Sequence, residues 1–175
     1  MKTLGIIFVL ALGAIVITQG QAGIDAKLQT QLKRVFPSAA RFDPKSGTPP
    51  HFKVYAKDAS GAEALAGYAF WTTELQPLER AYDGPIKMLV GMDVKGMLTG
   101  IAVVEHHEPY GDFSVDTAAF AAQFRGKDIR DAFKVGSDID AISRATISVT
   151  SASRAVRNSG RRMAREVMTP AGSTR

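Results

Sequence analysis

The sequence predicts an α+β domain in which an antiparallel sheet packs with helices. Helical apolar spacing occupies the first part of the chain, extended apolar patterns fill the middle, and helical spacing returns at the end. Such segregation of strands and helices is typical of α+β folds. The chain has 175 residues, 45% of them hydrophobic, which suffices for one domain with its own core.

The first 22 residues have the pattern of an export segment. Lys2 precedes an apolar run from Leu4 to Ile17, and the small residues of Gly20-Gln21-Ala22 follow. The run is short for a membrane-spanning helix, which needs about 20 residues, and suits a signal peptide. We therefore expect residues 1–22 to be a signal peptide cleaved after Ala22. The alternative is an anchor, residues 4–21, retained in the inner membrane. Either places the rest of the chain in a periplasm.

A helix and a linker are expected in residues 23–50, before the main domain at residues 51–168. The helix is predicted by the apolar spacing of Ile24, Leu28, Leu32 and Val35, and Pro37 stops it. Alternating or continuous apolar runs predict strands at 51–57, 64–73, 86–92 and 97–104. Residues 93–96 join the last two strands with a connection of hairpin length.

Helical spacing returns at about 117–124, 129–133 and 148–168, and residues 169–175 read as a flexible tail. One face of the last helix is apolar, with Val149, Ala152, Val156, Gly160, Met163 and Val167. Another face carries an arginine stripe, formed by Arg154, Arg157, Arg161 and Arg165. This stripe is typical of a solvated helix face; docking to an anionic partner or lipid is the alternative.

Composition restricts the chemistry. The chain has no cysteine, which excludes disulfides, iron–sulfur clusters and thiolate nucleophiles, so redox chemistry requires a bound cofactor. The net charge of +5 favours anionic partners and membrane surfaces. No basic patch with interleaved aromatic residues appears, so no nucleic-acid partner is expected.

The segment from Asp140 to Thr146 lies at the predicted start of the last helix. The first turn of a helix offers unpaired N–H groups and about +0.5 of dipole charge, which together favour an anion such as phosphate. Ser143, Thr146, Ser148, Thr150 and Ser151 are all residue types that cap helices, so capping alone is the competing interpretation.

Several motifs in order along the chain strengthen the phosphate interpretation. They are Gly67-Tyr68-Ala69-Phe70, Tyr82-Asp83-Gly84-Pro85-Ile86, Leu89-Val90-Gly91-Met92-Asp93, Gly96, Thr99-Gly100, Glu105-His106-His107-Glu108-Pro109, and Asp140 to Thr146. From about Ala64 to Glu166 the chain resembles the FMN-binding domain family. The resemblance is to the periplasmic domain of NosR/NirI-type flavoproteins and to the flavin subunits of Rnf and sodium-pumping NADH:quinone reductase complexes.

The resemblance implies a covalent cofactor, FMN joined through its phosphate to Thr146. Asp140, Ser143 and Ala145 then match the signature that a flavin transferase recognises. Arg144 departs from the family, which has glycine there, and could pair with the flavin phosphate.

The resemblance also puts the strand end with His106 and Glu108 beside the flavin pocket. Adjacent histidines on a strand point to opposite faces, so no metal site is expected there. Phe70 and Trp71 are expected in the core, with flavin stacking as the alternative.

We therefore expect an exported electron-transfer flavoprotein that relays electrons to or from a membrane-bound redox complex, rather than an enzyme with its own substrate. Two alternatives stay open. One is a binding or assembly subunit that keeps the fold without the flavin; the other is a flavin-dependent reductase with a small-molecule substrate.

Overall fold

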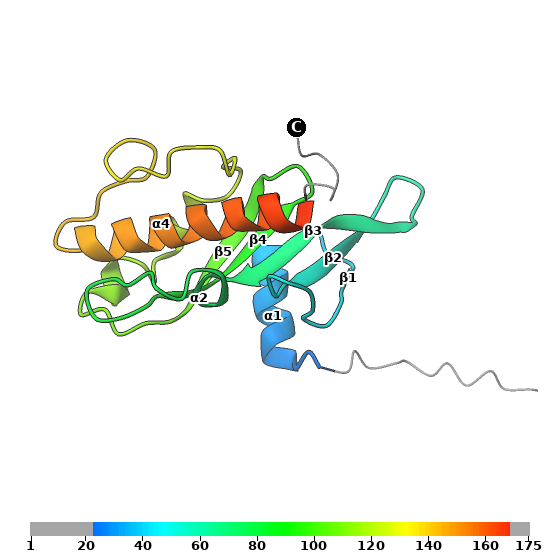
Figure 1. Ribbon diagram of the computed structural model, residues 1–175, viewed down its shortest axis with the longest axis horizontal. Coiled ribbons are helices and arrows are strands. Elements are labelled where there is room, and N and C mark those ends of the chain that lie inside the picture. Colours follow the sequence, from blue (N-terminus) through cyan, green and yellow to red (C-terminus); the bar gives the residue numbers. More distant parts are fainter. Residues whose placement is uncertain (1–22, 169–175) are drawn as a thin grey trace, which may run out of the picture.

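A computed structural model describes residues 23–168, so the predicted signal segment and tail lie outside the described residues. Its five strands are β1 (Arg41–Phe42), β2 (Phe52–Lys57), β3 (Glu63–Trp71), β4 (Lys87–Asp93) and β5 (Leu98–Glu105). They form one sheet in the order β1-β2-β3-β4-β5, and each pairs antiparallel with the next (Figure 1). The predicted α+β fold with an antiparallel sheet is confirmed.

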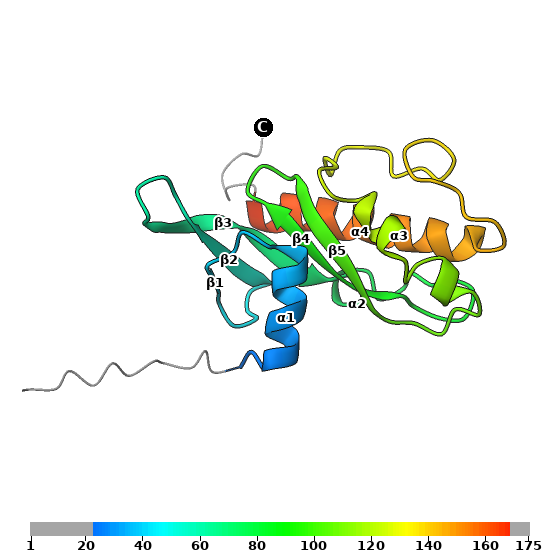
Figure 2. The same ribbon diagram turned by 180° about the vertical axis from the view of Figure 1, so that it is seen from behind.

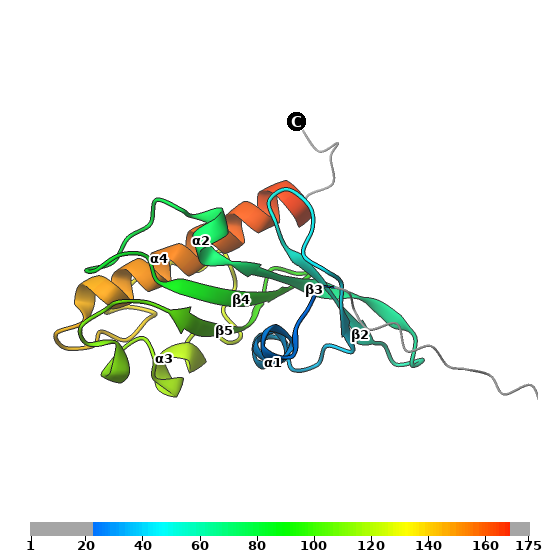
Figure 3. The same cartoon turned by 90° about the horizontal axis from the view of Figure 1, so that it is seen from below.

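Helices cover both faces of this sheet. They are α1 (Ala26–Val35), α2 (Thr72–Leu75), the 3-10 turn η1 (Gly111–Phe113), α3 (Ala118–Ala122), α4 (Thr146–Met163) and the π turn η2 (Ala164–Met168). The sheet lies between α1 and α4, and α3 lies beside β5 (Figures 2 and 3). Between residues 23 and 168, no helix combines the length and apolar character needed to span a bilayer.

Successive side chains of β4 pack into two different clusters of the core, one on each face of the sheet. Met88, Val90 and Met92 pack in the cluster that includes α4, whereas Leu89 packs in the cluster that includes α1. Successive side chains of a strand point to opposite faces, so a strand covered on both sides is apolar throughout. This explains why the sequence of β4 reads as a continuous apolar run. Phe70 and Trp71 are buried in the same two clusters, as expected for core residues.

Helix α1 packs against the sheet at a point of close backbone approach. Asp25 caps its first turn by accepting the Leu28 N–H at 2.7 Å. At its other end the Thr99 hydroxyl donates to the Val35 carbonyl at 2.6 Å. A Cβ on Gly91 would lie 2.5 Å from that carbonyl oxygen, so only glycine fits there. The predicted helix before Pro37 is confirmed.

Helix α4 lies across the sheet with its predicted apolar face inward. The face is confirmed, with Val149, Ala152, Val156, Gly160 and Met163 buried. A Cβ on Gly160 would lie 2.1 Å from the Ile129 side chain, so glycine allows this contact.

The arginine stripe is less solvated than the sequence indicates. Arg154 pairs with Glu79 at 2.7 Å, and Arg161 donates to the carbonyls of Ile129 and Asp131 at 3.1 and 2.9 Å.

Two sequence predictions are wrong in detail. Residues 129–133 form turns instead of a helix, because the Asp128 carboxylate accepts the Arg130 N–H and the Asp131 carboxylate accepts the Asp128 N–H. Such local side-chain bonds compete with helical hydrogen bonding. The strand predicted to reach residue 73 ends at Trp71, since Thr72 starts α2 and bonds to Ile86 O and Met88 N.

Candidate functional site

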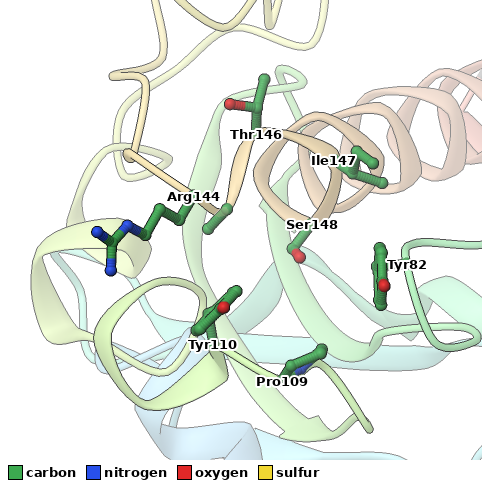
Figure 4. Close-up of a pocket in the computed structure, with 8 residues that line it drawn as sticks. Tyr82, Pro109, Tyr110, Arg144, Thr146, Ile147 and Ser148 are labelled. Atoms are coloured by element: carbon green, nitrogen blue, oxygen red, sulfur yellow. The ribbon is translucent and has the colours of Figure 1, made fainter.

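A cavity of about 410 Å³ opens at the N-terminal end of α4. Its walls come from three segments far apart in the sequence. The lining residues are Tyr82, Pro109, Tyr110, Arg144, Ala145, Thr146, Ile147 and Ser148. In Figure 4, Pro109 and Tyr110 lie across the cavity from the helix start, and Tyr82 stands on the side of Ser148. A cavity of this size is typical of small-molecule sites.

The helix start that forms one wall has no side-chain cap. Its N-cap residue is Ala145, which cannot accept a hydrogen bond through its side chain. The first three N–H groups, those of Thr146, Ile147 and Ser148, therefore lack an acceptor among the described residues. The competing interpretation, in which a serine or threonine caps this helix, is wrong. An uncapped helix start favours an anion.

Thr146 is the first residue of α4 and is exposed at the rim of the cavity. Its hydroxyl has no hydrogen-bond partner within residues 23–168. Figure 4 shows its side chain on the side of the helix start away from Pro109. The hydroxyl is therefore accessible both to the cavity edge and to a reagent approaching from solvent.

Arg144 occupies the left-handed backbone region, with φ of +65°. A residue with a Cβ is strained in this region, whereas glycine is not. The backbone at this position thus has a conformation that glycine adopts easily. The Arg144 side chain is exposed, and no ion-pair partner for it exists in the described chain.

Glu108 binds the hydroxyl of Ser148, which lines the cavity, and is only 6% exposed. Its carboxylate accepts the N–H groups of Tyr82 and Asp83 at 3.3 and 2.9 Å. It also accepts the hydroxyl of Ser148. Glu108 thus holds together the loop that contains Tyr82 and the first turn of α4.

His106 braces the segment that carries Tyr110. Its Nδ1 accepts the Glu108 N–H at 3.0 Å, which leaves Nε2 to donate to the Asp116 carboxylate at 2.9 Å. A Cβ on Gly111 would lie 2.0 Å from the imidazole, so the turn after Tyr110 packs directly on this ring. Across residues 23–168, no cluster of three or more histidine, aspartate or glutamate side chains could hold a metal ion.

The structure brings together some of the predicted site residues and separates others. Arg144, Ala145 and Thr146 line the cavity, whereas Asp140 and Ser143 are exposed on the segment that leads to it. The Asp140 N–H donates to the Gln123 side chain at 2.6 Å, which fixes that segment beside α3. His106 and Glu108 support the walls without lining the cavity.

Sequence reasoning did not identify the two tyrosines as site residues. Tyr82 is 69% exposed and Tyr110 is 44% exposed, although both are large aromatic residues. Tyr82 lies two residues before Gly84, and Tyr110 directly follows Pro109. Glycine and proline mark turns, and loops often carry binding residues, so this placement is the signal that could have found the tyrosines.

The segment that forms the cavity also matches known proteins in sequence. Residues 81–159, which contain the cavity and most of α4, match the FMN-binding domain family. The chain is also 39% identical, over 59 residues, to a protein of the ion-translocating oxidoreductase complex from Haemophilus influenzae strains PittEE and 86-028NP. The matched segment is 34% of this chain, and the chain spans only 26% of the length of these relatives.

Proposed function

Because residues 81–159 match the FMN-binding domain family, we propose that the protein is an exported, periplasmic electron-transfer flavoprotein. In this proposal FMN is held through a phosphoester on Thr146, and the protein relays electrons to or from a membrane-bound redox complex. When bound, FMN supplies electron transfer through its isoalloxazine ring. The chain's own residues bind the phosphate, orient the ring and leave its edge open to a partner.

The uncapped start of α4 is the observation that carries the proposal. The N–H groups of Thr146, Ile147 and Ser148 offer donors to a phosphate, and the helix dipole adds favourable charge. Arg144 supplies a guanidinium that has no carboxylate partner within residues 23–168, which suits it to a charge-assisted hydrogen bond. A phosphoester on the Thr146 oxygen is therefore compatible with its surroundings.

The aromatic walls of the cavity fit a planar ring. Tyr82 and Tyr110 offer ring faces and edges, and Pro109 and Ile147 add apolar surface. Aromatic rings attract one another in offset or edge-to-face arrangements. Tyr82 and Ile147 remain largely exposed, so a ring held between these walls stays accessible to an electron donor or acceptor.

Attachment requires an accessible hydroxyl and an accessible recognition segment. Thr146, Ser143 and Asp140 are all exposed. A flavin transferase would join the Thr146 Oγ1 to the flavin-bearing phosphorus of FAD, while the AMP leaves and the hydroxyl proton is lost. Covalent attachment retains the flavin in a compartment from which free FMN would diffuse away.

The proposed membrane partner is supported by similarity. The relatives that the chain matches over 59 residues belong to an ion-translocating oxidoreductase complex. The N-terminal apolar run, which predicts export or anchoring, would bring this domain to the same side of the membrane as its partner.

Expression with and without the transferase tests this function. Protein exported without a flavin transferase should fold but stay colourless, whereas co-expression with the transferase should give flavin that survives denaturation. The loaded protein should then exchange electrons with the membranes of its host. Flavin attaching spontaneously to purified apoprotein would contradict the maturation step, and loaded protein that exchanges no electrons would contradict the relay.

One observation favours the alternative of an assembly protein without flavin. Arg144 places a large, charged side chain at the position where the family has glycine, next to the acceptor threonine. If this side chain blocks the transferase, the wild-type chain stays colourless while Arg144→Gly becomes flavinylated. Flavin on the wild-type chain excludes this alternative.

A further inference from the structure

A second hollow, distinct from the FMN cavity, lies between α4 and the loop that precedes it. Its volume is about 500 Å³, and residues 132–135 of the loop form one wall while α4 forms the other. In Figure 1 this loop, drawn in yellow, runs alongside the N-terminal half of α4. We propose that this groove is the docking site for an acidic segment of a protein partner.

All the charged side chains that line the groove are positive. Its lining includes Lys134, Arg154, Arg157 and Arg161 and no acidic residue. Of these four cations, Arg154 alone has a carboxylate partner within the described part of the chain, namely Glu79. The charges of Lys134, Arg157 and Arg161 are not compensated by an ion pair anywhere in residues 23–168. Such a concentration of positive charge favours carboxylate groups of a partner.

The two central arginines are held in place and, as far as residues 23–168 are concerned, keep free donors. Arg161 uses Nε and Nη2 to bind the carbonyls of Ile129 and Asp131, which leaves Nη1 unused. Arg157 uses Nε on Asn158 and Nη1 on the Ala132 carbonyl, which leaves Nη2 unused. A guanidinium fixed on one edge loses less entropy when its other edge binds an anion.

The shape and apolar content of the groove favour a peptide over a lipid surface or a small ion. Its walls include the exposed Ala132 and the half-buried Val135, which a carboxylate-bearing peptide can cover with its apolar side chains. A hollow between a helix and a loop is concave, whereas a bilayer surface would contact a flat or convex cationic face. A single inorganic anion would leave most of the 500 Å³ unfilled.

The groove lies on the same helix as the FMN attachment site. Thr150 in its lining is one turn from Thr146, and Arg161 is about 22 Å along the axis from Thr146 at 1.5 Å per residue. A partner segment bound along the groove would therefore reach to about one helical turn from the FMN attachment residue. This surface goes beyond the proposed function, because binding of the acidic segment requires no flavin.

Binding of an oligo-glutamate peptide to the full chain tests the proposal directly. The labelled peptide is titrated with the protein and followed by fluorescence anisotropy. Binding is expected at low salt and should be lost at about 1 M salt, where the Debye length falls to about 3 Å. Lys134→Glu should weaken it by about tenfold, because the Lys134 ammonium has no partner among the described residues and reversing it repels the peptide.

A matched control separates the groove from net charge. Lys95→Glu reverses an exposed lysine in the β4–β5 turn, outside the groove, and should leave the affinity unchanged. Equal affinities for the Lys134→Glu and wild-type proteins would overturn the proposal. The proposal would also be overturned if Lys134→Glu weakened binding of the protein to anionic phosphatidylglycerol vesicles but left its binding to the peptide unchanged. Neither result depends on flavin content, so failure here is distinguishable from failure of the FMN assignment.

Discussion

The Ser148 hydroxyl donates to the buried carboxylate of Glu108, forty residues earlier in the chain. Glu108 follows β5, while Ser148 lies in the first turn of α4. The same carboxylate accepts two N–H groups of the loop at Tyr82 and Asp83. One side chain therefore fixes both the uncapped helix start and one aromatic wall of the cavity. The Ser148 hydroxyl is thus bound to Glu108, while the first-turn N–H groups of α4 have no acceptor among the described residues.

Removing this carboxylate should destabilise the fold. Glu108→Ala leaves the Ser148 hydroxyl and two loop N–H groups without an acceptor, at a cost of about 1–3 kcal/mol for each buried donor that water does not reach. We expect a loss of about 3 kcal/mol in the free energy of unfolding, measured by urea denaturation. Glu105→Ala, which removes a largely exposed carboxylate nearby, should change it by less than about 0.5 kcal/mol. Equal losses for the two variants would show that Glu108 does not act as this brace.

Arg144 should be strained by its backbone conformation. At φ of +65°, replacing it with glycine removes the Cβ clash, whereas alanine keeps it. Arg144→Gly should therefore be more stable than Arg144→Ala by about 1 kcal/mol, although both remove the same charge. Gln29, which is exposed within α1, serves as the control position. There the alanine variant should be more stable than the glycine variant by about 1 kcal/mol, because glycine is unfavourable inside a helix. If alanine is the more stable residue at position 144 as well, the strain assignment is wrong.

Asp138 should make the loop before α4 sensitive to acid. Partial burial acts to raise the pKa of Asp138, but hydrogen bonds from Lys134 N–H, Lys127 and Phe133 N–H outweigh it, so the pKa is lowered. A carboxylate with a lowered folded-state pKa stabilises the fold above its unfolded pKa of about 3.9. That contribution is lost as the pH falls through the folded-state pKa.

The stability difference between wild type and Asp138→Asn should therefore shrink as the pH falls from about 5 toward 2. Thermal denaturation across this range measures it. Asp112→Asn serves as the control, because this exposed carboxylate has no hydrogen-bond partner among the described residues. A difference for Asp138→Asn that stays constant with pH would contradict this account.

Regular elements with strong periodicity could be predicted from the sequence. The α1 helix, the β4–β5 hairpin and the buried face of α4 follow from apolar spacing alone, because each buries one repeating set of side chains. The turns at residues 129–133 could not be predicted in this way. There the side chains of Asp128 and Asp131 bind nearby N–H groups and outcompete the helix.

The candidate site was predictable only where its residues are contiguous. Arg144, Ala145 and Thr146 occur together in one segment, so a motif identifies them. Tyr82 and Tyr110 meet them only through the folded chain, and Glu108 reaches Ser148 across forty residues. The helix start held five possible capping residues in sequence, yet the N-cap is Ala145, because chain geometry and not composition decides which residue occupies that position.

The attachment of FMN to Thr146 is tested most directly by the intact mass of the protein co-expressed with a flavin transferase. The wild-type chain and Thr150→Ala, which removes a threonine one turn further along α4, should both gain the mass of one FMN less one water. Thr146→Ser keeps a hydroxyl at the same place, so partial modification of this variant is compatible with the account. Thr146→Ala should remain at the unmodified mass while it folds normally. A Thr146→Ala protein that still carries the added flavin mass would contradict the central claim.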